Sequence, residues 1–187
     1  MFGLRIAFCG LVAGVLVLAT AAVASAAPAS PLTGLVNAAA ERLLTADPVA
    51  AFKWHDGNRI DDPARVDQVL AMVSADAIAN QLDADYVRRI FTDQIDATEA
   101  VEYRRFSEWK LVPGAAPRDA PDLSASRERI DALNHTMVAE IASHSGLLHS
   151  AQCPAERRNA LNAVATTRQL DELYRRALDV ATGSYCT

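Results

Sequence analysis

The sequence predicts an all-α protein with one domain, a bundle of about six helices that carries one disulfide. Two observations lead to this prediction. No segment shows the alternation of β-branched and polar residues that is typical of a strand, and residues that favour helices, chiefly alanine, leucine and arginine, dominate. Apolar side chains also recur at helical spacing along several long segments. The roughly 160 residues that follow the N-terminal leader are enough to bury one hydrophobic core.

The first element, residues 1–26, is expected to be a signal peptide. Arg5 is its only charged residue, residues 6–24 are almost entirely apolar, and the segment ends in the small-x-small pattern Ala24-Ser25-Ala26. The apolar run is also just long enough for a membrane anchor. The cleavage pattern and the prolines that follow favour removal, so we expect the remaining domain, residues 27–187, to be exported.

Three helices are expected in the first half of the domain. The first runs from Pro31 to Leu44. Asp47 followed by Pro48 predicts an N-cap and a first-turn proline, so either a second helix starts there and continues to about Trp54, or the first helix kinks. After a turn, the third helix covers residues 62–82.

The second half begins with the strongest helix signal in the chain. Asp83 is expected to cap a long helix over residues 84–111, in which apolar residues recur at close to helical spacing. A proline-rich loop over residues 112–121 follows, and Leu123 or Ser124 opens the next helix.

The last helical segment, residues 155–182, lies between two cysteines. The exported domain contains two cysteines, Cys153 and Cys186, and an even number of cysteines in an exported chain predicts a disulfide. On the chain-entropy model this disulfide contributes roughly 3–4 kcal/mol to stability. A straight helix would hold the two sulfur atoms too far apart to bond. The tail must therefore bend or fold back across other helices.

Composition and motifs exclude several functions. The net charge of −5 offers no basic excess, so nucleic acid is not an expected partner. The four histidines form no His-Glu-x-x-His motif, and no metal site is expected. Nucleophile elbows and glycine-rich phosphate loops do not occur in the sequence.

Charged residues within apolar helical segments are the candidates for a site. Lys53, one of only two lysines, lies among alanines and aromatic residues, where it either extends its amine to solvent or faces an anionic ligand. Arg42 lies about three helical turns earlier, and Thr98 and Glu102 share one helix face. On spacing alone, these residues also fit surface charges and helix-end ion pairs. Trp54 and Trp109 are expected to be core residues or amphipathic anchors, not platforms for a ligand.

Several long stretches resemble one family. They are Ala39–Leu43, Ala46–Trp54, Asp93–Tyr103, Arg105–Lys110, Pro121–Arg127 and the tail with Cys153 and Ser184-Tyr185-Cys186. They are similar to the secreted, all-helical chorismate mutases, the exported gamma branch of the AroQ class. The resemblance covers nearly all of the chain after the leader.

The resemblance implies an isomerase that converts chorismate to prephenate by a pericyclic rearrangement. It implies no cofactor, no metal and no covalent intermediate, and it implies a homodimer that is secreted or periplasmic and free of the membrane once the leader is removed. Such an enzyme has to hold a flexible dianion in its reactive shape and stabilise charge on the breaking ether oxygen.

The resemblance also implies roles for five charged residues. Arg42, Arg65 and Arg127 would bind the two substrate carboxylates, because arginine offers forked, charge-assisted donors. Lys53 and Glu102 would both donate to the ether oxygen, which requires Glu102 to be protonated. Lys53, Glu102 and Arg65 are the expected catalytic residues.

The contact to the substrate hydroxyl is where this sequence departs from the family pattern. Thr98 is expected to bind a carboxylate, and Asp62 to hold the hydroxyl or orient the region of Arg65. Many relatives contact the hydroxyl through a glutamate directly after the arginine or a glutamine four residues after it, where this chain has Val66 and Val69.

Two other functions therefore remain as alternatives. A homologue with weak catalysis would act as a secreted binding protein, and a helical bundle without a ligand would serve a structural role in the cell envelope. Loss of chorismate absorbance on adding the protein distinguishes the enzyme from the binding protein. A structural bundle would gain no protection against heat from a bicyclic mimic of the transition state.

Overall fold

The computed structural model describes residues 29–119 and 122–187, which form helices and no strand. The α-helices are α1 (Thr33–Leu43), α2 (Ala46–Asp56), α3 (Pro63–Ala79), α4 (Ala84–Leu111), α5 (Leu123–Ser143), α6 (Ser145–Leu148), α7 (Cys153–Thr167) and α8 (Glu172–Ala181), and the 3₁₀ helices are η1 (Pro113–Ala115) and η2 (Gly183–Tyr185). The predicted all-α class is confirmed. The expected signal peptide lies outside the described residues, and among the helices that are described none has the length and hydropathy of a membrane span.

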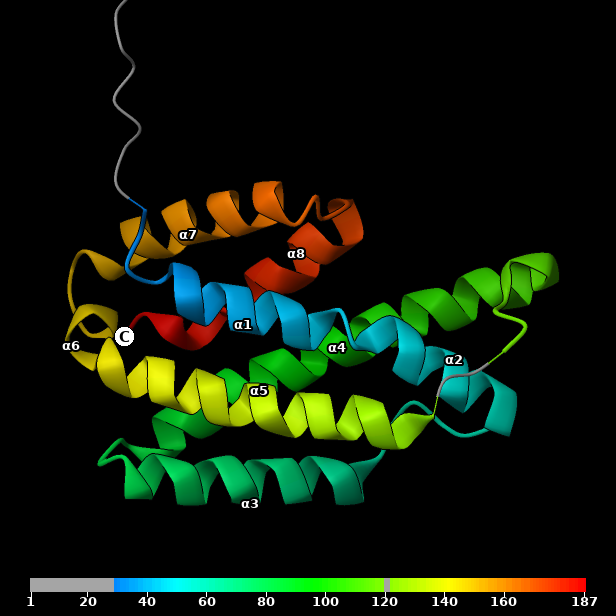
Figure 1. Ribbon diagram of the computed structural model, residues 1–187, viewed down its shortest axis with the longest axis horizontal. Helices are drawn as coiled ribbons and strands as arrows, with labels where there is room; N and C mark the ends of the chain where they lie inside the picture. The colour runs from blue at the N-terminus through cyan, green and yellow to red at the C-terminus, as the bar shows by residue number, and fades with distance from the viewer. Residues whose placement is uncertain (1–28, 120–121) are drawn as a thin grey trace, which may run out of the picture.

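The long helix α4 is the scaffold on which the others assemble. Figure 1 shows α3, α5, α1 and α7 stacked one above another, with α4 crossing behind α5. Helix α4 packs against α8, α3 and α2, while α1 packs against α5 and α7. The core between these helices is fully buried and includes Leu35, Ile90, Phe91, Met137 and Leu178. Each such side chain contributes about 1.5–3 kcal/mol through the hydrophobic effect.

Aspartate side chains cap four of the helices. Asp62, Asp83, Asp122 and Asp171 each accept a hydrogen bond from a backbone N–H in the first turn of α3, α4, α5 and α8. Such a cap stabilises a helix by about 1 kcal/mol. The predicted start of the long helix, with its cap at Asp83 and its end at Leu111, is confirmed.

The predicted cap at Asp47 is wrong. Helix α2 already begins at Ala46, and the Asp47 carboxylate accepts a hydrogen bond from Arg105 Nε at 2.7 Å. This ion pair to α4 is stronger than a bond to a neutral backbone N–H. Pro48 is tolerated within the first turn of α2, where backbone N–H groups have no partner in the helix. The break between α1 and α2 is consequently short.

A small aromatic cluster fixes α2 on α4. Trp54 makes edge contacts with Phe106 and Trp109, with ring centroids 5.2 and 5.6 Å apart. Ala50 and Ala51 pack beneath them. Trp109 is buried and Trp54 is half-buried against it, so the prediction that they act as core residues or amphipathic anchors is confirmed. The cluster sets the position of Lys53, which lies one residue before Trp54.

The tail bends as predicted and is closed by the Cys153–Cys186 disulfide. Helices α7 and α8 are joined by a tight turn in which Gln169 adopts a φ of 52°. The turn reverses the chain, so the two cysteine Cα atoms lie 5.6 Å apart. Tyr86 Oη on α4 donates to the carbonyl of Tyr185 at 2.6 Å and ties the returning tail to the core.

Replacing both cysteines by serine should lower the free energy of unfolding by about 3–4 kcal/mol, because the disulfide no longer restricts the unfolded chain. Urea denaturation followed by circular dichroism measures this loss. Dithiothreitol should destabilise the unaltered protein to a similar extent and leave the double variant unaffected. Equal midpoints for the oxidised protein and the variant would contradict the prediction.

Candidate active site

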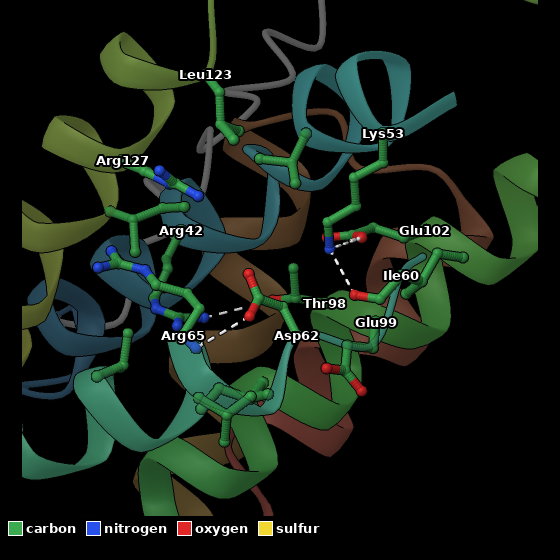
Figure 2. Close-up of a pocket in the computed structure, with 15 residues that line it drawn as sticks. Arg42, Lys53, Ile60, Asp62, Arg65, Thr98, Glu99, Glu102, Leu123 and Arg127 are labelled. Carbon is green, nitrogen blue, oxygen red and sulfur yellow. Dashed lines mark hydrogen bonds and ion pairs between the residues drawn. The ribbon is translucent and has the colours of Figure 1, made fainter. Parts of the chain in front are cut away.

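One pocket collects polar side chains from five segments of the chain (Figure 2). The structure brings together all seven residues predicted to bind substrate, and these are Arg42, Lys53, Asp62, Arg65, Thr98, Glu102 and Arg127. They come from α1, α2, α3 with its cap, α4 and α5. The catalytic and binding roles assigned to them remain predictions.

Helix geometry explains how these side chains meet. Arg42 lies in the last turn of α1, and Lys53 lies on α2 just beyond the short break. Thr98 and Glu102 are four residues apart on α4 and therefore project from the same face. Arg127 lies near the start of α5 and makes no hydrogen bond or ion pair within the described part of the chain.

Arg42 is a buried cation, with 5% of its surface exposed. Its Nε donates to Asn134 Oδ1 at 2.8 Å, and its Nη1 donates to Thr98 Oγ1 at 3.4 Å and to the Gln94 carbonyl at 3.5 Å. Burial, and next the charge of Arg65, lowers the pKa of Arg42 to about 10, so it stays cationic at neutral pH. No ion pair to a carboxylate neutralises it within the described residues.

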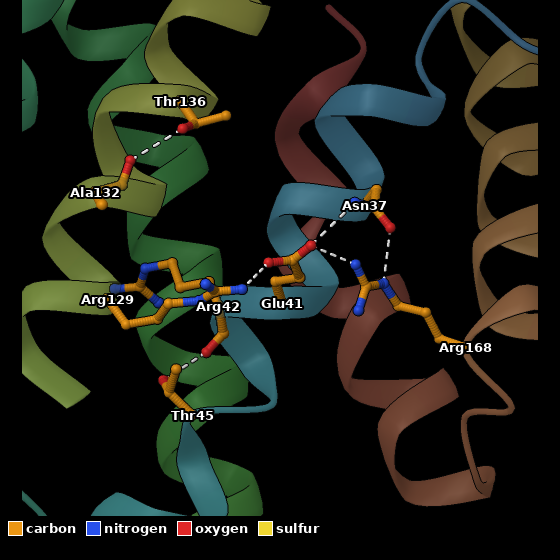
Figure 3. Close-up of polar contacts among 8 residues, drawn as sticks. All are labelled: Asn37, Glu41, Arg42, Thr45, Arg129, Ala132, Thr136 and Arg168. Carbon is orange, nitrogen blue, oxygen red and sulfur yellow. Dashed lines mark hydrogen bonds and ion pairs between the residues drawn. The ribbon is translucent and has the colours of Figure 1, made fainter. Parts of the chain in front are cut away.

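The carboxylate next to Arg42 in the sequence is already engaged elsewhere. Glu41 pairs with Arg129 of α5 and with Arg168 after α7, as Figure 3 shows. Asn37 donates to the same carboxylate at 3.2 Å. This network joins three parts of the bundle and leaves the charge of Arg42 available to a ligand.

Arg65 is oriented from both sides. Its backbone N–H donates to the capping carboxylate of Asp62 at 3.1 Å. Its guanidinium donates to Asp131 at 2.6 Å and to Gln68 at 2.9 Å. Gln68 thus faces Arg65, whereas Val66 and Val69 line the pocket and offer no hydrogen bond.

Lys53 and Glu102 form the most enclosed pair in the pocket. Lys53 Nζ lies 2.8 Å from Glu102 Oε2 and donates to the Ile60 carbonyl at 2.7 Å. Glu102 has only 2% of its surface exposed. Burial raises the pKa of Glu102 to about 7, although the positive charge of Lys53 opposes the rise. Glu102 is therefore able to carry a proton near neutral pH.

The sequence analysis missed one polar residue of the pocket, Glu99. Burial raises the pKa of its carboxyl, and the nearby charge of Asp61 adds to the rise. Its spacing of three residues from Glu102 on α4 is the signal that would have found it. Apolar side chains make up the rest of the wall, and these are Val49, Ile60, Val66, Val69, Ile95, Leu123 and Ile130.

The fold and the pocket define a class of protein. It is an all-helical, disulfide-linked protein whose pocket combines four cations with apolar walls and a protonatable acid. Such a pocket suits a small molecule with more than one negative charge, because cations in a water-poor site attract anions strongly.

Comparisons with known proteins give the family. Residues 33–103 match the model of the family described as chorismate mutase type II. The chain is 56% identical over 163 residues to the secreted chorismate mutase of Mycolicibacterium smegmatis, covering 87% of this chain and 90% of the relative. It is 54% identical over 157 residues to that of Mycobacterium tuberculosis, covering 84% and 79%. The solved chorismate mutase of Burkholderia phymatum superposes with a TM-score of 0.80 at 33% identity, over 84% of this chain and 97% of that one. The chain belongs to the secreted chorismate mutases, which are isomerases.

Replacing Lys53 by methionine should raise the pKa of Glu102 above 7, because Lys53 is the cation that opposes the effect of burial. Carboxyl chemical shifts of labelled glutamate, followed by NMR over pH, measure this midpoint. The matched variant Lys110→Met removes the other lysine, which is exposed on α4, and should leave the titration unchanged. A Glu102 midpoint near 4.5 in the unaltered protein would refute the account of this pair.

Proposed function

We propose that this pocket converts chorismate to prephenate by a non-covalent pericyclic rearrangement. One observation supports the proposal above all others, which is that four cationic side chains and the buried Lys53–Glu102 pair meet in one pocket. Membership of the chorismate mutase family supports the same substrate and product.

The reaction makes two physical demands on the protein. One C–O bond breaks while one C–C bond forms within the same molecule, so no atom has to be supplied or removed. The flexible dianion must be held in the diaxial shape that brings the two carbons together, and negative charge develops on the ether oxygen. An acceleration of about 10⁶ requires roughly 8 kcal/mol of transition-state stabilisation.

The arginines meet the first demand. Arg42, Arg65 and Arg127 bind the two carboxylates from α1, α3 and α5, and fixing both ends of the molecule restricts its conformations. Asp131 limits the motion of the Arg65 guanidinium through their 2.6 Å contact. Thr98 adds a hydroxyl beside Arg42.

Lys53 and Glu102 meet the second demand. The ether oxygen accepts hydrogen bonds from Lys53 Nζ and from a protonated Glu102, which gives up its contact with Lys53, and both bonds strengthen as the C–O bond breaks. A dianion bound nearby further favours the neutral form of Glu102. The Ile60 carbonyl keeps the Lys53 amine in place while Glu102 changes partner.

Glu99 is our candidate for the contact to the substrate hydroxyl. Val66 and Val69 offer no acceptor, and one carboxylate oxygen of Asp62 is occupied by the cap of α3. Glu99 lines the same pocket, and its carboxyl group has no other role in the proposed reaction.

We also propose that the leader, residues 1–26, is removed on export. The homodimer remains a prediction.

Purified protein should accelerate the loss of chorismate absorbance, and Lys53→Ala should lower kcat by about 100-fold or more, as removal of a transition-state donor does elsewhere. The variant Lys110→Ala serves as the control and should retain the activity of the unaltered protein. If the folded, oxidised protein converts chorismate no faster than buffer does, the proposed function fails.

Activity should fall as pH rises through about 7, because Glu102 loses the proton that it donates. Below about pH 7 the Glu102 carboxyl is protonated, so its ionisation does not lower the activity in that range. Glu102→Gln keeps a hydrogen-bond donor at every pH and should flatten the alkaline decline. The measurement is kcat/KM between pH 5 and 9, and a constant value in the unaltered protein would contradict the role of a neutral Glu102.

A further inference from the structure

Asn134 is not among the residues that line the pocket, and a hydrogen bond connects it to Arg42, which is. It is on α5, is 0% exposed, and its Oδ1 accepts the hydrogen bond from Arg42 Nε at 2.8 Å. Arginine offers only donors, so this contact fixes which end of the amide faces Arg42. The other end, Nδ2, has no hydrogen-bond partner among the described residues. Among the described residues, the hydrogen bond from Arg42 is therefore the only one that the Asn134 side chain makes.

The protein atoms that hold Arg42 are all neutral. Asn134 Oδ1 accepts from Nε, while Thr98 Oγ1 and the Gln94 carbonyl accept from Nη1. Nη2 makes no hydrogen bond within the described part of the chain. The nearby carboxylates have other partners, since Asp131 pairs with Arg65 and Glu41 pairs with Arg129 and Arg168 (Figure 3).

A neutral acceptor differs from a carboxylate in what it leaves for the ligand. A carboxylate at position 134 would form a buried ion pair with Arg42 and cancel its attraction for an anion. An amide oxygen fixes the guanidinium plane by one hydrogen bond and does not cancel the charge.

We propose that Asn134 is a positioning residue for Arg42, which it holds by Nε so that the undiminished charge and the unpaired Nη2 serve a substrate carboxylate. This inference rests on the proposed function. The carboxylate is present in both the substrate and the transition state, so Asn134 contributes to binding in each and is expected to affect KM more than kcat.

The test compares Asn134→Asp and Asn134→Ala with the control Asn162→Asp, which adds the same charge on the exposed face of α7. We expect Asn134→Asp to raise KM, and the Kd of a bicyclic dicarboxylate that mimics the transition state, by about 10-fold or more with a smaller change in kcat. Asn134→Ala should act in the same direction, while Asn162→Asp should match the unaltered protein. Circular dichroism checks that each variant is folded.

A double-mutant cycle separates positioning from a general packing role. Lysine lacks Nε, so Asn134→Ala should weaken dicarboxylate binding much less in the Arg42→Lys background than in the unaltered protein. An equal loss in both backgrounds overturns the proposal, as does unchanged KM in a folded Asn134→Asp variant. If Asn134→Asp does not fold, the Asn134→Ala cycle decides alone. An inactive unaltered protein would instead refute the proposed function, which distinguishes the two failures.

Discussion

Burial of positive charge beside neutral acceptors is the constraint on which the pocket depends. Arg42 is placed among α1, α4 and α5, where water is excluded and the attraction to an anion is several times stronger than in solution. Burying an unpaired cation is costly, and the cost is reduced here by the hydrogen bonds that Arg42 donates to Asn134 Oδ1, Thr98 Oγ1 and the Gln94 carbonyl. Carboxylates near Arg42 are bound to other arginines, so the pocket keeps an excess of positive charge for a ligand.

Burial disfavours charge on Glu102 as it does on Arg42, but for an acid this raises the pKa instead of lowering it. It favours the neutral acid, and Lys53 limits the rise of the pKa to about 7. The position of Lys53 depends in turn on the packing of Trp54 against α4 and on the Ile60 carbonyl. Packing of α2 and the electrostatics of the acid are therefore linked, although the aromatic cluster itself does not line the pocket.

Local signals in the sequence predicted the elements that depend on local interactions. The long helix with its cap at Asp83 followed from the caps and the apolar spacing. The start of α2 did not, because Asp47 bonds to Arg105, a residue 58 positions away that the local pattern does not include. Spacing alone left the charged candidates indistinguishable from surface residues, and the family resemblance selected the seven that line the pocket. Glu99 was missed although its spacing from Glu102 places it on the same side of α4, because the sequence did not show that this side lines a pocket. Asn134 was missed because a single asparagine has no distinctive pattern, and only the packing of α1 against α5 gives it Arg42 as a partner.

We propose that the pocket pairs a small dianion with a protonated Glu102. Isothermal titration calorimetry of a bicyclic dicarboxylate, repeated at pH 8 in buffers of different ionisation enthalpy, measures the protons taken up on binding. Glu102, with its pKa near 7, is mostly ionised in the free protein at pH 8 and must gain a proton to donate to the ligand. We expect an uptake close to one proton per ligand, with little uptake at pH 5.5 and none for Glu102→Gln. Tight binding without proton uptake at pH 8 would contradict it.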